Sequence, residues 1–101
     1  MAAFRPLRLR YSARARSQLL ALHEYISGQG NPEAARRVAA SIRDAVELLR
    51  HFPHMGRPGR ASGTREWVVR QAPHVIAYEI DAEDRGEVVV LGIYHFRQDR
   101  K

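Results

Sequence analysis

The stretch "SGQGNPEAARR", residues 27–37, ends one predicted helix and begins another. Gly28 and Gly30 end the first helix, because glycine readily adopts the left-handed backbone conformation that closes a helix. Asn31 can then cap the second helix, and Pro32 suits its first position, where a missing N–H costs no hydrogen bond. The stretch therefore predicts two helices joined by a few residues, which is an antiparallel helical hairpin.

Apolar residues recur at helical spacing on both sides of this connection. The first helix is predicted over about 12–28, with Ser12 as its N-cap, and the second from 32 to about 50. Their apolar stripes consist of Ala15, Leu19, Leu22 and Ile26 in the first helix and Ala35, Val38, Ile42, Val46 and Leu49 in the second. Because short amphipathic helices are marginal in isolation, these stripes need a sheet to pack on.

Strand patterns flank the hairpin. "PLRLRYS", residues 6–12, alternates apolar and basic side chains, as a strand with one buried face does. Three further strands are predicted in "TREWVVR" (64–70), "HVIAYEID" (74–81) and "EVVVLGIYH" (87–95), with Trp67 and Val69 on the core face of the first of these. The links "QAP" and "AEDRG" between them predict hairpin turns, and hence an antiparallel meander.

The resulting order is β-α-α-β-β-β, an α+β fold in which an N-terminal strand and a helical hairpin pack on a mainly antiparallel four-stranded sheet. A chain of 101 residues can bury one compact core, so a single domain is predicted over 1–101. The segment "HFPHMGRPGRASG", residues 51–63, is predicted to lack regular structure because its prolines and glycines break helices and strands.

Composition narrows the class of protein. The formal net charge is +6, and 16 of the 17 Lys and Arg residues are arginine, a surface that attracts phosphates or acidic partners. A GC-rich genome would produce the same bias. The absence of cysteine excludes a disulfide scaffold and thiolate metal sites. No cofactor and no metal site are expected, and without an apolar signal core or membrane span we expect a cytoplasmic protein without membrane partners.

Two basic groups are candidates for a site. One is the loop with Arg57, Arg60 and Arg65, and the other is the last strand and tail with Tyr94, His95, Arg97 and Arg100. If the last strand lies centrally in the sheet, both groups can line one concave face. Aromatic, imidazole and guanidinium groups together can bind or cleave a phosphodiester. The alternative is a solubilising loop and a solvated tail.

Several motifs in combination resemble the ParE branch of the RelE/ParE toxins of bacterial type II toxin–antitoxin systems. They are "NPEAARRV", "FPHMGRPGR", "GTREWVV", "PHVIAYEI" and "VVVLGIYHFRQD", and the resemblance covers about residues 7–99. It implies the β-α-α-β-β-β fold that the patterns predict independently.

The resemblance implies one of two biochemistries. ParE-type members poison DNA gyrase by stabilising its broken-DNA state, without established chemistry of their own, whereas RelE-type members cleave messenger RNA on the ribosome. RNA-cleaving relatives commonly carry an arginine three residues before the tyrosine of the penultimate strand, where this chain has Val75 before Tyr78. The resemblance therefore favours the gyrase branch with no catalytic residues. The alternatives are a nuclease, which would rely on Arg65, His95 and Arg97, and a divergent or inactive relative.

The resemblance also implies partners. A cognate ParD-like antitoxin would wrap the toxin in a hetero-oligomer, while operator DNA would be reached only indirectly, through the antitoxin. Arginine side chains would hold an acidic antitoxin tail. The residues expected to bind the target or the antitoxin are Arg57, Arg60, Arg65, Tyr94, His95 and Arg97.

Overall fold

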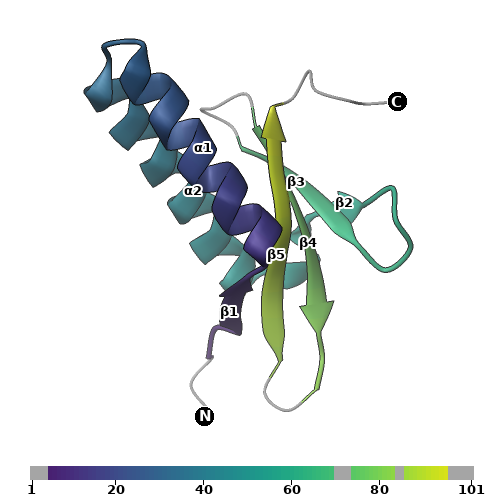
Figure 1. Cartoon of the computed structure of the whole chain (residues 1–101). Helices are drawn as coiled ribbons and strands as arrows, with labels where there is room; N and C mark the ends of the chain where they lie inside the picture. The colour runs from purple at the N-terminus through teal and green to yellow at the C-terminus, as the bar shows by residue number, and fades with distance from the viewer. Residues whose placement is uncertain (1–4, 70–73, 84–85, 96–101) are drawn as a thin grey trace.

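A computed structural model describes residues 5–69, 74–83 and 86–95 (Figure 1). Two antiparallel helices, α1 (Ala13–Gly28) and α2 (Pro32–His51), lie together on one side of a five-stranded sheet. The strands are β1 (Arg8–Tyr11), β2 (Arg57–Pro58), β3 (Arg65–Val69), β4 (His74–Asp81) and β5 (Glu87–His95). Their spatial order is β1-β5-β4-β3-β2, with β1 parallel to β5 and every other pair antiparallel. The α+β prediction is confirmed, and β5 is an interior strand.

Side-chain caps define where both helices begin. The Ser12 hydroxyl accepts the N–H of Ala15 at 3.0 Å, and the Asn31 side-chain oxygen accepts the N–H of Ala34 at 3.1 Å. Each bond satisfies one of the backbone donors that a helix leaves unpaired at its start. Between the helices, Gly30 adopts φ +78°, the left-handed conformation expected where the hairpin turns.

The prediction of a four-stranded sheet is wrong by one strand. Residues Arg57 and Pro58 pair with Glu66 and Arg65 as the edge strand β2, and Pro53–Met55 forms a 3₁₀ turn, η1, within the segment predicted to be irregular. An edge strand tolerates proline because the strand has a neighbour on one side only. The glycines and prolines of this segment give no strand pattern in the sequence, and the strand forms through its pairing with β3.

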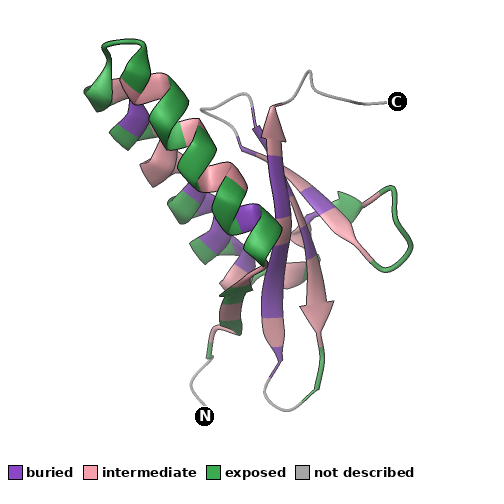
Figure 2. Ribbon diagram, viewed as in Figure 1, coloured by how far each residue is buried: buried purple, intermediate pink, exposed green. Residues whose placement is uncertain are grey.

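The core lies between the helical hairpin and one face of the sheet, where the buried ribbon segments of Figure 2 face one another. Tyr78, Ile76 and Val90 are fully buried there, against Ile42 and Leu49 of α2. Trp67 packs against this core on the predicted face but is only half-buried.

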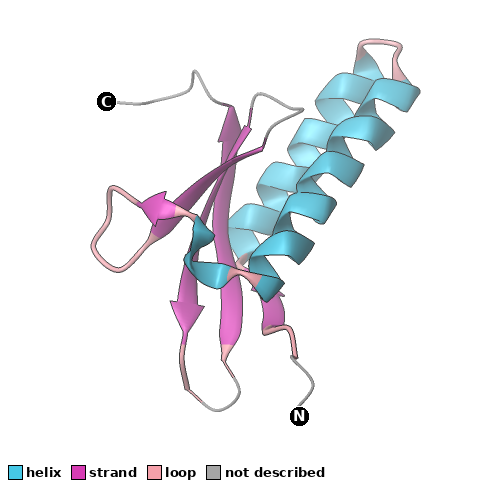
Figure 3. Cartoon of the chain, turned by 180° about the vertical axis from the view of Figure 1, so that it is seen from behind, coloured by secondary structure: helices cyan, strands magenta, loops and turns pink. Residues whose placement is uncertain are grey.

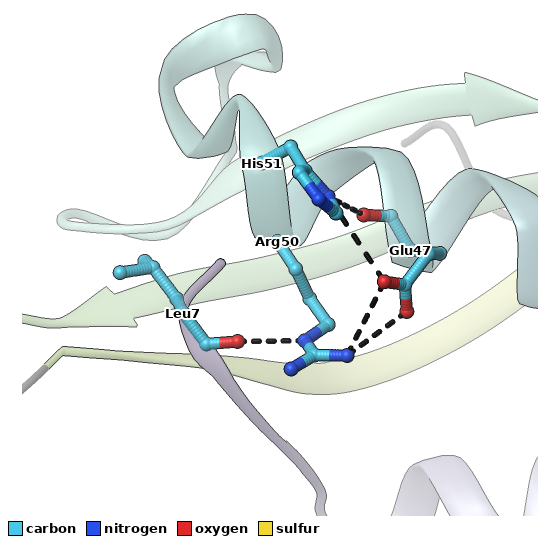
Figure 4. Close-up of polar contacts among 4 residues, drawn as sticks. All are labelled: Leu7, Glu47, Arg50 and His51. Carbon is cyan, nitrogen blue, oxygen red and sulfur yellow. Dashed lines mark hydrogen bonds and ion pairs between the residues drawn. The ribbon is translucent and has the colours of Figure 1, made fainter. Parts of the chain in front are cut away.

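A polar network joins the end of α2 to the segment that enters β1 (Figure 4). The N–H of Leu7 donates to the carbonyl of Arg50 at 3.0 Å, and Arg50 Nε donates in return to the carbonyl of Leu7 at 2.6 Å. Arg50 Nη1 also contacts both carboxylate oxygens of Glu47, at 3.0 and 3.3 Å, which fixes the guanidinium. The network holds β1 in place beside β5.

Two of the predicted turns involve residues outside the described ranges. The "QAP" turn, residues 71–73, lies there entirely, and so does part of the "AEDRG" turn; its described end, Gly86, adopts φ +86°. Across the described helices, none is both long enough and apolar enough to span a membrane.

Candidate functional site

A cavity of about 470 Å³ opens on the face of the sheet that the helices leave uncovered. Its floor follows a row of paired residues, Glu66 on β3, Ala77 on β4 and Gly92 on β5. Successive residues of a strand point to opposite faces, so this row faces away from the core side chains Trp67 and Ile76. The lining residues are Arg14, Gln18, Arg60, Ala61, Thr64, Glu66, Ala77, Leu91, Gly92 and Tyr94.

The first half of α1 closes one side of the cavity. The strand β1 pairs with β5 only as far as Val90, and beyond that point α1 supplies the partners. Ser12 Oγ donates to the carbonyl of Leu91 at 3.1 Å, and Gln18 Oε1 accepts the N–H of Ile93 at 2.7 Å. These two bonds lie beside the point where the register between β4 and β5 shifts. They hold the start of α1 against β5, and Arg14 therefore lies at the rim of the cavity.

The β2–β3 loop closes the opposite side, seen at the left in Figure 3, and its base is fastened to the sheet. The Tyr78 hydroxyl accepts the N–H of Gly56 at 2.9 Å and donates to the carbonyl of Pro53 at 2.7 Å. Arg65 Nη1 donates to the carbonyls of His54 and Gly56, at 3.2 and 2.8 Å. Burial raises the pKa of Tyr78, although the Gly56 bond and Arg65 act in the opposite direction. The hydroxyl therefore stays protonated as a donor.

Charge in the cavity is divided between its floor and its rim. Glu66 is 7% exposed, and its Oε1 contacts Arg57 Nη2 at 3.3 Å across the β2–β3 pair. Arg14 and Arg60 line the cavity from the helix and from the loop. The arrangement combines one buried carboxylate with a cationic rim, and such groups can bind hydrogen-bond donors and negative charge respectively.

A second depression, of about 440 Å³, separates α1 from the end of β5. His74 and His95 are paired across β4 and β5 with ring centroids 5.6 Å apart and planes at 76°. His74 Nδ1 is buried and has no hydrogen-bond partner among the described residues. Burial, followed by the proximity of His95, lowers the pKa of His74.

The structure brings some of the predicted site residues together and separates others. Arg60 and Tyr94 line one cavity, and Arg57 adjoins it through Glu66. Arg65 lies opposite Tyr78 and His95 opposite His74, a separation of four residues, or about 13 Å, along β4. Arg97 lies outside the described residues.

Among the lining residues, only Arg60 and Tyr94 are predicted from the sequence, and the charged or amide side chains that sequence reasoning misses are Arg14, Gln18 and Glu66. The alternation that places Trp67 in the core also places Glu66 on the opposite face, so a signal existed for this carboxylate. Arg14 and Gln18 belong to the polar face of a helix, and no local pattern indicates which strand that face adjoins.

Solved structures share this fold. The chain matches a structure described as the chromosomal ParDE toxin–antitoxin system from P. aeruginosa with a TM-score of 0.77 and 21% identity, over 88% of this chain and 95% of that one. It matches the toxin–antitoxin complex RelBE2 from Mycobacterium tuberculosis with a TM-score of 0.62 and 26% identity, over 90% and 99% of the two chains. The architecture is that of the RelE/ParE superfamily of toxins.

Sequence comparison is more specific. Residues 9–100 match the family model described as the ParE toxin of the type II toxin–antitoxin system parDE, and the chain belongs to this family. Y4kP of Sinorhizobium fredii, a proposed toxin, is 38% identical over 91 residues, 90% of each chain. Toxin RelE2 of Caulobacter vibrioides is 40% identical over 67 residues, 66% of this chain and 73% of the relative. The protein is thus the toxin of a type II toxin–antitoxin system. The names of its relatives come from both the ParE and the RelE branch of the superfamily.

Proposed function

We propose that this ParE-family toxin poisons DNA gyrase by stabilising the state in which the DNA is broken, and that a cognate ParD-like antitoxin neutralises it in the cytoplasm. The observation that carries the proposal is the composition of the cavity on the open sheet face. Its described lining includes two arginines, a carboxylate and a tyrosine but no histidine. Such a cavity has groups for binding, and its described lining lacks histidine, the side chain that most often transfers protons in catalysis.

Two of the three groups that an RNA-cleaving member would use, Arg65 and His95, have other contacts in the described part of the chain. Arg65 donates to the carbonyls of His54 and Gly56, and His95 stands against His74. Val75, in the position where a nuclease would carry arginine, is fully buried. An apolar side chain does not stabilise the charge of a phosphorane. These three placements favour gyrase over the ribosome as the target.

The net positive charge and the structural neighbours of the chain both support an antitoxin partner. The net charge of +6 suits an acidic tail, and the structural neighbours are described as toxin–antitoxin systems. A permanent complex of this kind buries roughly 2,000 Å² or more in total. Operator DNA then meets the toxin only through the antitoxin.

The experiment is a supercoiling assay with purified gyrase, ATP, relaxed plasmid and the antitoxin-free toxin, whose folding is checked first by circular dichroism. We expect inhibition together with linear DNA released on denaturing the trapped complex. Toxin premixed with its antitoxin is the control and should leave supercoiling intact. Undisturbed gyrase, combined with cut messenger RNA in a translation reaction, would transfer the function to the ribosome.

A further inference from the structure

The cavity on the open sheet face has the dimensions and the chemistry of a nucleotide pocket. We propose that it binds one unpaired guanine nucleotide of a DNA strand, with Glu66 reading the base edge, Tyr94 stacking on the ring, and Arg14 and Arg60 holding the flanking phosphates. This inference rests on the proposed function in one respect, since gyrase-bound DNA would supply the strand.

The floor of the pocket is shaped by two small residues that face each other across β4 and β5. Ala77 pairs with Gly92, and a Cβ on Gly92 would lie 3.3 Å from Gln18 Oε1 and 3.5 Å from Tyr94 Cε1. Any larger residue at position 92 would therefore narrow the space beside the Tyr94 ring. The volume of about 470 Å³ lies within the range of roughly 300–1,000 Å³ typical of small-ligand sites.

Glu66 selects the base. An ionised carboxylate only accepts hydrogen bonds, and it binds most strongly where two parallel donors meet its two oxygens. Guanine presents two adjacent donors, N1–H and N2–H, on its Watson–Crick edge. Cytosine and adenine present an amino group beside an acceptor nitrogen, and thymine presents one N–H between two carbonyls. Arg57, at 3.3 Å from Glu66 Oε1, helps to orient the carboxylate from the edge strand.

The rim supplies affinity without base selection. Arg14 approaches from α1 and Arg60 from the β2–β3 loop, which lie on opposite sides of β5 and β4 in Figure 1. Guanidinium groups bind phosphate oxygens and set the position of a strand, whereas contacts with the base set the sequence. Tyr94 adds a stacking surface, which tolerates every base.

The test measures fluorescence anisotropy of labelled heptamers with the purified toxin alone, without gyrase. We expect d(TTTGTTT) to bind about tenfold more tightly than d(TTTTTTT), d(TTTCTTT) or d(TTTATTT), the discrimination typical of a bidentate base contact. Arg14→Ala and Arg60→Ala should each reduce the slope of log affinity against log salt by about 0.7, the value for one phosphate of a single strand.

Variants of the floor give the decisive comparison. Glu66→Gln should abolish the preference for guanine and leave binding of d(TTTTTTT) within about twofold, because the phosphate contacts persist. Glu79→Gln is the matched control, because Glu79 lies on the same face of the sheet as Ala77 but outside the cavity. This variant should retain the preference for guanine. Ala77→Val, which fills the floor without changing charge, should also remove the preference, and it serves if Glu66→Gln does not fold.

Equal binding of the four DNA heptamers, a guanine preference that survives Glu66→Gln, or tighter binding of r(UUUGUUU) than of its DNA counterpart would each overturn the inference. The supercoiling assay is independent of this outcome. A toxin that prefers guanine but leaves gyrase untouched would retain the pocket and refute the proposed function. A toxin that traps gyrase cleavage but shows no base preference would support the proposed function and refute the guanine pocket.

Discussion

The hydroxyl of Tyr78 and the backbone N–H of Gly56 form a buried hydrogen bond of 2.9 Å that joins the centre of the sheet to the base of its basic loop. The same hydroxyl donates to the carbonyl of Pro53 at 2.7 Å. One side chain therefore satisfies two backbone groups of a segment that carries few regular hydrogen bonds. The position of Arg57 and Arg60 beside the cavity depends on this anchor.

Replacement of Tyr78 by phenylalanine should destabilise the protein by about 1–3 kcal/mol, because the buried N–H of Gly56 loses its partner. Urea unfolding followed by circular dichroism measures the change. Tyr25→Phe is the control, since Tyr25 is 66% exposed, and its effect should stay within about 0.5 kcal/mol. Equal stabilities of the two variants would contradict the anchoring role of Tyr78.

Gly56→Ala should also be destabilising, by about 1–3 kcal/mol for an overpacked site. The added Cβ would stand 2.5 Å from Tyr78 Oη and 2.8 Å from the carbonyl oxygen of Glu66, which is backbone and cannot easily move. Gly28→Ala provides a comparison of opposite sign. Its Cβ meets nothing within 4 Å, and alanine in a helix is favoured over glycine by about 0.5–1 kcal/mol. Thermal unfolding of both variants checks the pair, and a Gly56→Ala protein as stable as wild type would refute the close approach.

Trp67→Ala should cost about 2 kcal/mol, less than the roughly 3–5 kcal/mol of a fully buried large aromatic, because Trp67 is only half-buried against the core. Phe52→Ala, at a side chain 58% exposed, should change the free energy of unfolding much less. Chemical denaturation separates the two variants. Indistinguishable midpoints would show that Trp67 does not face the core.

The double change Arg57→Ala and Arg60→Ala should weaken toxicity or antitoxin affinity while the fold persists. Arg57 and Arg60 are exposed in or beside the loop, so their removal opens no cavity in the core, although Glu66 loses its contact with Arg57. Growth inhibition on induction and titration with the antitoxin are the measurements. Arg36→Ala with Arg37→Ala, which removes the same charge from α2, should preserve both properties. If the loop variant matches this control, the loop arginines serve only solubility.

Acid should destabilise the protein partly through His74. Its pKa is lowered by burial and by His95, so the folded state disfavours the protonated ring. The unfolded chain takes up this proton as pH falls through about 6.5, so the stability that His74 contributes is present above that pH and is lost below it. Urea unfolding between pH 5 and 8 should show a smaller loss for His74→Gln than for wild type. If the free energy of unfolding of His74→Gln falls with pH by the same amount as that of wild type, His74 does not contribute to the acid destabilisation.

The parts of the fold that were predictable are those with local causes. Caps at Ser12 and Asn31 and continuous apolar stripes predict the helical hairpin. Alternation predicts β1 and β3, and β-branched and aromatic content predicts β4 and β5. The short strand β2 has no such signal, because Tyr78 and Arg65 bind the chain around Gly56 from elements far along the sequence.

The site divides in the same way. Arg60 and Tyr94 could be assigned to one face from the chain order alone, provided that β5 is interior. The contact of α1 with β5 could not be predicted from the sequence. It depends on Gln18, whose side chain accepts the N–H of Ile93 where none of the described strands does so. Arg14 reaches the cavity only through that long-range contact.

The parallel pairing of β1 with β5 affects the moment at which the protein becomes functional. Leu9 lies beside Val88, so the two ends of the sheet close a loop that spans almost the whole domain. Loops of this length form late in folding, since their closure entropy must be met before the contacts form. During synthesis β1 and the helical hairpin leave the ribosome before β5, so the apolar stripes of the hairpin stay uncovered until the sheet can form. We therefore expect the complete sheet, and with it the cavity on its open face, to form only after nearly the whole chain has been translated.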